Sequence, residues 1–223
     1  MRVDPTGNNF FPDLETLAAM TEAAANQRCT GEPETPLPPR HWAFLSDAIN
    51  DAIRVETGRL RPATKALAEK ALDRLRDGSV DDKSLLLILG GLHCLGRSKE
   101  NMGLDCSGFV KHLAKEAGAP LESSITAPGK NGCTQMKGSF PPVAPEDART
   151  GDLIFFNNKA DPQKTASHVG IVIVAHDGEK LFLHMTNHGV DINKMSDIAS
   201  NETRATWGGQ LCGFARNPAV CPA

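Results

Sequence analysis

The N-terminal third of the chain combines segments of helical periodicity with one proline-rich stretch. Three segments carry apolar residues at every third or fourth position: 13–27, 42–58 and 62–78. This spacing predicts three amphipathic helices, with Asp13 as the cap of the first and Pro62 in the opening turn of the third. Between the first two lies TGEPETPLPP (30–39), which predicts a linker because it suits neither a regular helix nor a central strand.

In the second half of the chain the pattern changes to one helix followed by short apolar runs. Phe109 begins a helical stripe that reaches Ala117, and Gly118 suits the end of that helix. Four runs then have the length and composition of strands: 152–156, 169–174, 180–184 and 211–215. A helix packed on antiparallel strands, after a helical preamble, is an α+β layout. We expect one compact domain over 91–223, preceded by a helical N-terminal extension over 1–90.

Composition narrows the possible functions. The chain has 223 residues, a formal charge of −3 and 40% hydrophobic residues, values typical of a globular protein with one substantial core. Its slightly acidic balance argues against a nucleic-acid binder, which usually presents a basic face. No apolar run approaches the length that spans a bilayer. The N-terminus, MRVDPTGNNFFPDLETL, lacks the basic and apolar regions of a signal peptide. We therefore expect a non-classical export route to the periplasm, or otherwise residence in the cytoplasm.

The cysteines favour no metal site and no cofactor. There are six: Cys29, Cys94, Cys106, Cys133, Cys212 and Cys221. None of them belongs to a CxxC pair, so the spacing does not predict a structural zinc site. We expect most of them to be small buried side chains, with room for one disulfide near the C-terminus.

A turn of four residues, Asp105-Cys106-Ser107-Gly108, enters the helix predicted in the second half. A helix N-terminus carries partial positive charge and unpaired N–H groups, and both stabilise a thiolate. The same N–H groups can hold the oxyanion that forms when a thiolate attacks a carbonyl. Cys106 is therefore a candidate nucleophile; the alternative is a buried cysteine that opens a helix.

A cysteine nucleophile needs a base, and His168 opens the apolar run VGIVIV. Such a histidine can face a helix that packs on its strand, which suits a Cys–His pair; the alternative is a capping or exposed histidine. A third polar group normally fixes the tautomer of the base. Four residues are candidates for this role: His176, His184, Asn187 and His188.

The register of the hairpin between the second and third strands selects among these candidates. A loop centred on His176 places His184 opposite His168. A two-residue turn at Asp177-Gly178 instead places Asn187 opposite that histidine. The residues alone leave both registers open.

Four strings in this order, LDCSGFVKHLAKEAG, GDLIFF, SHVGIVI and FLH, resemble the NlpC/p60 family of cysteine peptidases. The resemblance covers roughly residues 92–215. It implies a papain-like fold in which the helix that carries the cysteine packs on a small antiparallel sheet. It also implies Cys106 as nucleophile, His168 as base and His184 as the orienting residue. The hairpin between the histidines is longer than in the usual motif, by about the same number of residues on each arm.

The same resemblance implies a substrate. Members of the family mostly cleave amide bonds in peptidoglycan stem peptides, so residues 91–223 are expected to be an NlpC-like hydrolase domain acting on such peptides. An acyltransferase or deamidase acting on another amide or ester is the alternative. One departure concerns the stretch before Cys106, which in the family usually holds a tyrosine and a tryptophan; here it reads GLHCLG, and the chain has no tyrosine.

The surroundings of the expected domain suggest where it acts. Neither an SH3-like nor a LysM-like wall-binding module is recognisable, and the chain instead has its helical preamble and a long insertion over 119–149. We expect an exported antibacterial effector, with an immunity or secretion-machinery protein as partner, or a phage-associated lysin.

Overall fold

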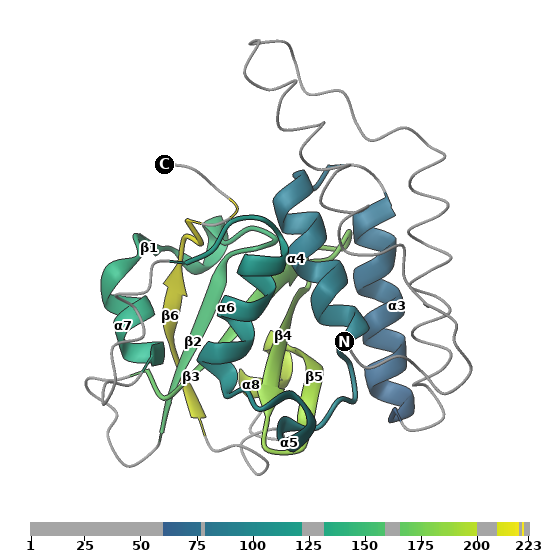
Figure 1. Ribbon diagram of the computed structural model, residues 1–223. Helices are drawn as coiled ribbons and strands as arrows, with labels where there is room; N and C mark the ends of the chain where they lie inside the picture. Colours follow the sequence, from purple (N-terminus) through teal and green to yellow (C-terminus); the bar gives the residue numbers. More distant parts are fainter. Residues whose placement is uncertain are drawn as a thin grey trace.

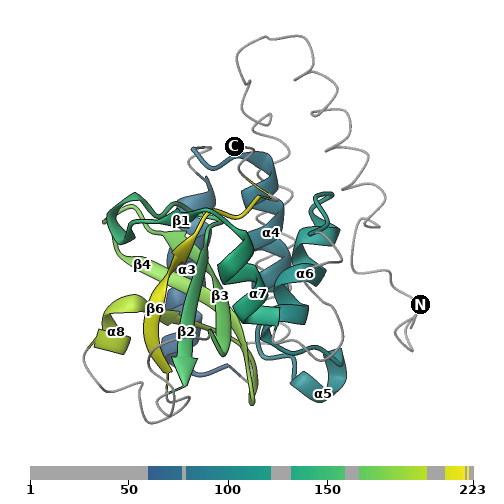
Figure 2. The same cartoon turned by 90° about the vertical axis from the view of Figure 1, so that its left-hand side faces the viewer.

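The computed structural model describes residues 60–76, 79–121, 132–158, 166–199, 209–218 and 220. Within them the chain forms a six-stranded sheet in the order β1-β6-β2-β3-β4-β5, and every neighbouring pair is antiparallel. Helices α4 and α6 cross in front of this sheet, and α8 lies on the opposite side (Figures 1 and 2). The α+β class predicted from the sequence is confirmed. The helices expected over 13–27 and 42–58 and the linker between them lie outside the described residues.

The helical elements in chain order are α3 (Pro62–Arg76), α4 (Asp82–His93), α5 (Lys99–Met102), α6 (Cys106–Glu116), α7 (Gly132–Ser139), the 3-10 helix η2 (Pro145–Asp147) and α8 (Met195–Ala199). The strands are β1 (Pro142–Val143), β2 (Leu153–Asn158), β3 (His168–Val174), β4 (Lys180–Thr186), β5 (Gly189–Lys194) and β6 (Gly209–Ala215). All four predicted strands are present. The sequence pattern did not predict β1, β5 or the helical elements α4, α5, α7, η2 and α8.

The two faces of the sheet bury different side chains because strand residues alternate sides. The face under the helices holds Leu181 and Leu183 of β4 in a large core shared with α3, α4 and α6. The other face holds Phe182 of β4 in a smaller cluster. The expected boundary at residue 90 falls within α4, whose buried side chains belong to the larger core. The helices from residue 62 onward are therefore part of the same folded body as the sheet.

Helix α4 approaches the sheet closely at a glycine. A Cβ atom at Gly91 would lie 2.9 Å from Leu183 Cδ1 and 3.3 Å from Leu113 Cδ1. Real Cβ contacts of 2.9 Å are essentially absent from proteins, so the lack of a side chain lets α4 pack on both β4 and α6. The helix runs through Gly90-Gly91 and ends at His93. Among the described residues, no helix is long and apolar enough to cross a membrane.

The β3–β4 hairpin has a register that neither sequence alternative predicted. Its ladder pairs Val174 with Lys180 and Ile171 with Leu183. The turn is closed by a hydrogen bond from Gly178 N to Ala175 O, and Gly178 has a φ of 80°. A three-residue loop whose last residue is left-handed gives this intermediate register. Both predicted registers are therefore wrong.

In the observed register His184 lies beside Gly170, where a Cβ atom would be 3.3 Å from His184 Cβ. His168 is two residues from Gly170 along β3, so it shares a face of the sheet with His184. The two histidines are thus diagonal neighbours, a separation that their rings can bridge.

Candidate active site

Cys106 is the first residue of α6, and Asp105 caps that helix. The Asp105 carboxylate accepts hydrogen bonds from Gly108 N at 2.6 Å and from Ser107 Oγ at 2.9 Å. Desolvation raises the pKa of Asp105, but these two bonds outweigh it, so the pKa lies below its ordinary value. The carboxylate therefore stays ionised and satisfies a first-turn donor, as an N-cap does. The N–H groups of Cys106 and Ser107 remain at the helix end as candidate oxyanion donors.

The Cys106 thiol is strongly acidified, with its pKa lowered from 9.0 to about 4. The largest cause is a hydrogen bond from the Cys133 thiol; burial works in the opposite direction. A hydrogen bond from His168 and the charge of that imidazole lower the pKa further, and the backbone of Val169 adds to the effect. Cys106 is accordingly a thiolate near neutral pH, the form that attacks carbonyl carbon.

Cys133 was not expected in the site. Its Sγ lies 3.4 Å from Cys106 Sγ. The hydrogen bond to Cys106, followed by burial, raises the pKa of Cys133, so this thiol keeps its proton. A close approach of α7 brings it there, because a Cβ atom at Gly132 would be 2.4 Å from Ser107 Oγ. Thr134 Oγ1 anchors the same helix by donating to Ala166 O at 3.0 Å. The described cysteines Cys94, Cys106, Cys133 and Cys212 are all free thiols.

The structure brings His168 and His184 together. His168 Nε2 lies 2.7 Å from His184 Nδ1, and the rings meet edge to face with centroids 5.0 Å apart. His168 Nδ1 is therefore the ring nitrogen left to serve Cys106. His184 is fully buried, and that burial, followed by the charge of His168, holds its pKa well below the ordinary value. Asn187 is exposed in the turn between β4 and β5.

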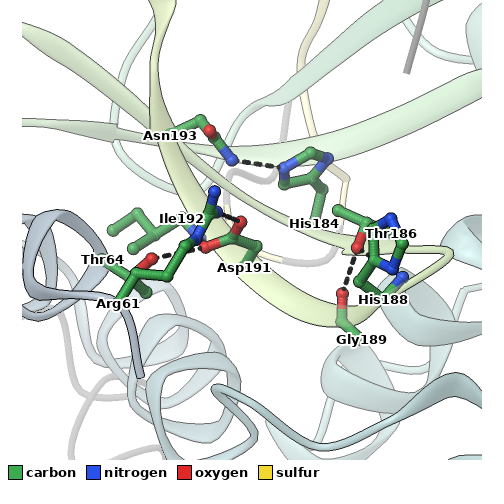
Figure 3. A network of polar contacts seen from close by, with 9 residues as sticks. All are labelled: Arg61, Thr64, His184, Thr186, His188, Gly189, Asp191, Ile192 and Asn193. Carbon is green, nitrogen blue, oxygen red and sulfur yellow. Dashed lines mark hydrogen bonds and ion pairs between the residues drawn. The ribbon is translucent and has the colours of Figure 1, made fainter. Parts of the chain in front are cut away.

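A fourth side chain, Asn193 of β5, contacts His184. Asn193 Nδ2 lies 2.9 Å from His184 Nε2 (Figure 3), whereas His168 contacts the other ring nitrogen, Nδ1. Two residues earlier, Asp191 forms an ion pair with Arg61 and accepts a hydrogen bond from Thr64 Oγ1 at 3.0 Å. These contacts fasten β5 to the start of α3. The alternation of Val190 and Ile192 with polar residues is the strand signal that would have revealed β5 from the sequence.

The remaining predicted candidates lie elsewhere. His176 is exposed in the β3–β4 turn, where its Nε2 is 3.2 Å from Asp73 O, and His188 is exposed in the β4–β5 turn. A cavity of about 660 Å³ opens beside the N-terminus of α6, lined by Lys99, Glu100, Gly103, Leu104, Asp105 and Gly108. In the described part of the chain, no group of three His, Cys, Asp or Glu side chains could hold a metal ion.

Comparison with known proteins identifies the family. The model of the NlpC/P60 family matches residues 93–208, just over half of the chain. The protein therefore belongs to the NlpC/P60 family, whose members are commonly peptidoglycan hydrolases. A search of curated proteins gives no match.

Three solved structures are similar to this chain. An NlpC/P60 family protein from Bacillus cereus ATCC 10987 is 23% identical over 60% of this chain and 39% of its own, with a TM-score of 0.44. A protein described as similar to lipoprotein, NLP/P60 family, from Staphylococcus aureus subsp. aureus Mu50 is 19% identical over 61% and 41%, with a TM-score of 0.44. The NlpC/p60 domain of peptidoglycan hydrolase SagA is 15% identical over 60% and 97%, with a TM-score of 0.38. The chain thus spans about two fifths of the length of the first two.

Proposed function

We propose that this protein is a cysteine peptidase or amidase that hydrolyses amide bonds in peptidoglycan stem peptides. The observation that carries the proposal is the contact of one acidified thiol, Cys106, with an imidazole that a second imidazole holds from behind. A thiolate, a base and an orienting group in this order are the parts that acyl transfer from an amide needs.

The reaction proceeds through an acyl-enzyme. The Cys106 thiolate attacks the amide carbonyl carbon, and the resulting oxyanion is held by N–H groups at the start of α6. The C–N bond then breaks as His168 gives its proton to the leaving amine. Water attacks the thioester while His168 takes up a proton, and the carboxylic acid and the thiolate are released.

The cavity at the N-terminus of α6, whose lining does not include Cys106, carries charged groups of both signs. Lys99 supplies a positive group, and Glu100 and Asp105 supply negative ones at the same opening. Hydrogen bonds at the start of α5, chiefly from its own backbone and from Ser98, lower the pKa of Glu100, so its carboxylate is ionised at neutral pH. A stem peptide carries both free amino and free carboxyl groups, so it can pair with both signs of charge here.

The test is digestion of purified peptidoglycan, followed by mass analysis of the soluble fragments. The wild type should release peptides with a new amine and a new carboxyl terminus, and Cys106→Ala should release none. Cys212→Ala, which removes a free thiol of β6, is the matched control and should behave as the wild type. Intact peptidoglycan after incubation with a folded wild type would contradict the substrate, and turnover of other amides or esters would favour the deamidase or acyltransferase alternative.

We also propose that the protein acts in the periplasm as an exported effector or a phage-associated lysin, with an immunity or secretion-machinery protein as partner. Its substrate lies outside the cytoplasm, which supports this placement. Expression in the bacterial cytoplasm should be nearly harmless, whereas forced export should cause lysis that Cys106→Ala abolishes. Equal toxicity in both compartments would contradict a murein target.

A further inference from the structure

The contacts behind Cys106 form a continuous series of four side chains: Cys106, His168, His184 and Asn193. Only the first three have a role in the proposed hydrolysis. The amide of Asn193 lies against His184 Nε2 (Figure 3), while His168 contacts Nδ1 of the same ring. The inference below rests on the proposed function and concerns how this fourth residue controls the base.

The chemistry of the base fixes where its protons must be. Beside the Cys106 thiolate, His168 gives its Nδ1 proton to the leaving amine and later takes one from water at the same nitrogen, so Nε2 carries a proton throughout. That N–H points at His184 Nδ1, 2.7 Å away, which must then be an acceptor without a proton. A neutral imidazole carries one proton, so the proton of His184 has to sit on Nε2.

His184 cannot satisfy its Nε2 atom by a hydrogen bond to bulk water, and it does not carry a second proton. It is fully buried, and its pKa is held well below the ordinary value by burial and by the charge of His168. Its ring is also fixed by Phe182, whose centroid is 4.8 Å away. The group that faces Nε2 therefore decides which tautomer is stable, since a buried N–H without an acceptor costs about 1–3 kcal/mol.

A carboxamide is able to stabilise either tautomer. With its nitrogen toward the ring, as in Figure 3, Asn193 donates to Nε2, and the proton of His184 moves to Nδ1. His168 Nε2 must then accept, so a neutral His168 carries its only proton on Nδ1 and would become an imidazolate if it gave that proton to the leaving amine. A half-turn of the amide presents the oxygen at the same place, and the tautomer reverses.

We propose that Asn193 is a positioning residue whose amide oxygen accepts the Nε2 proton of His184, leaving His184 Nδ1 free to accept from His168. The ion pair of Asp191 with Arg61 and its hydrogen bond from Thr64 hold β5 in place. In this position the Asn193 amide reaches the His184 ring. Asn193 thus acts on the base through His184 and contacts no reacting atom.

Two substitutions separate the acceptor role from the donor role. Asn193→Leu keeps the shape and removes both functions, and should lower kcat/KM for peptidoglycan peptide about tenfold, the effect of one lost neutral hydrogen bond. Asn193→Asp can only accept, and should retain more activity than Asn193→Leu at neutral pH. Because its negative charge raises the pKa of His184, its activity should fall on the acid side at a higher pH than in the wild type. Equal loss in both variants would overturn the acceptor role.

The tautomer itself can be observed without any substrate. The ¹⁵N shifts of His184 in the labelled full chain should report a proton on Nε2 in the wild type and a shift toward Nδ1 in Asn193→Leu. Asn187→Leu, an exposed asparagine in the β4–β5 turn, is the matched control and should change neither the shifts nor kcat/KM. A wild-type proton on Nδ1, or a tautomer unchanged by Asn193→Leu, would overturn the inference. Failure to cut peptidoglycan would instead count against the proposed function alone.

Discussion

The two halves of the candidate active site are built in different ways. The cysteine half is local: Asp105, Cys106, Ser107 and Gly108 are consecutive, and the cap that holds the nucleophile bonds within the same turn. The histidine half is assembled from three strands, since His168, His184 and Asn193 come from β3, β4 and β5. Its geometry depends on the registers of the β3–β4 and β4–β5 hairpins. It also depends on the contacts of Asp191 with Arg61 and Thr64.

The two halves should therefore respond differently to substitutions. A helix cap loses about 1 kcal/mol when its side chain is removed, and the helix remains. A one-residue slip in a strand moves every side chain to the other face. Substitution of His184 or Asn193 in the histidine half should therefore act on proton transfer and leave the thiolate in place, whereas loss of the cap in the cysteine half should act on the local stability of the helix end.

The largest effect is expected where the two halves meet. Cys106→Ala removes the nucleophile and His168→Ala removes the base, so each should lower kcat by at least about 10³-fold while the thermal unfolding midpoint changes little. Peptide release from peptidoglycan and a thermal melt measure both quantities. Wild-type turnover by either folded variant would exclude that residue from the chemistry.

The next effect separates the halves. His184→Ala should lower kcat/KM about 100-fold, because the base loses the group that orients it. Alkylation of Cys106 by iodoacetamide should persist, because the thiolate keeps its helix end and Cys133. Asn187→Ala is the control and should match the wild type in both assays. If Asn187→Ala were the inactive variant, the role given to the β3–β4 register would be wrong.

A third effect concerns Cys133, the thiol that α7 brings to the cysteine half. Cys133→Ala removes the thiol that contributes most to the lowered pKa of Cys106, so the pH midpoint for alkylation of Cys106 should move upward. Cys133→Ser, which keeps a donor, should move it less, and Cys212→Ala should leave it unchanged. An unshifted midpoint in Cys133→Ala would mean that His168 and the helix end account for the thiolate by themselves.

The smallest effect is expected at the cap. Asp105→Ala should lower the free energy of unfolding by about 1 kcal/mol, because Gly108 N loses its side-chain acceptor. Chemical denaturation measures this loss, and Asp147→Ala in the exposed η2 turn is a suitable control. A loss of several kcal/mol would show that the cysteine half is not local.

The same contrast explains what the sequence could reveal. The turn at Asp105–Gly108 and the start of α6 could be predicted because their determinants are adjacent in the chain. His184 could be proposed from the family pattern, but its register could not, because Gly178 allows several turn types. Cys133 had no local signal: α7 shows no apolar stripe, and only packing of Gly132 on Ser107 brings that thiol to Cys106. Asn193 likewise acquires its partner through tertiary pairing alone.

The cysteine half and the histidine half together keep Cys106 as a thiolate. The pH dependence of Cys106 alkylation in the wild type tests this most directly. Cys106 has a pKa of about 4, so the alkylation rate should already be near its plateau at pH 6 and should fall only as the pH approaches that value. A rate that instead rises through pH 8 to 9, as for an ordinary cysteine, would contradict the account.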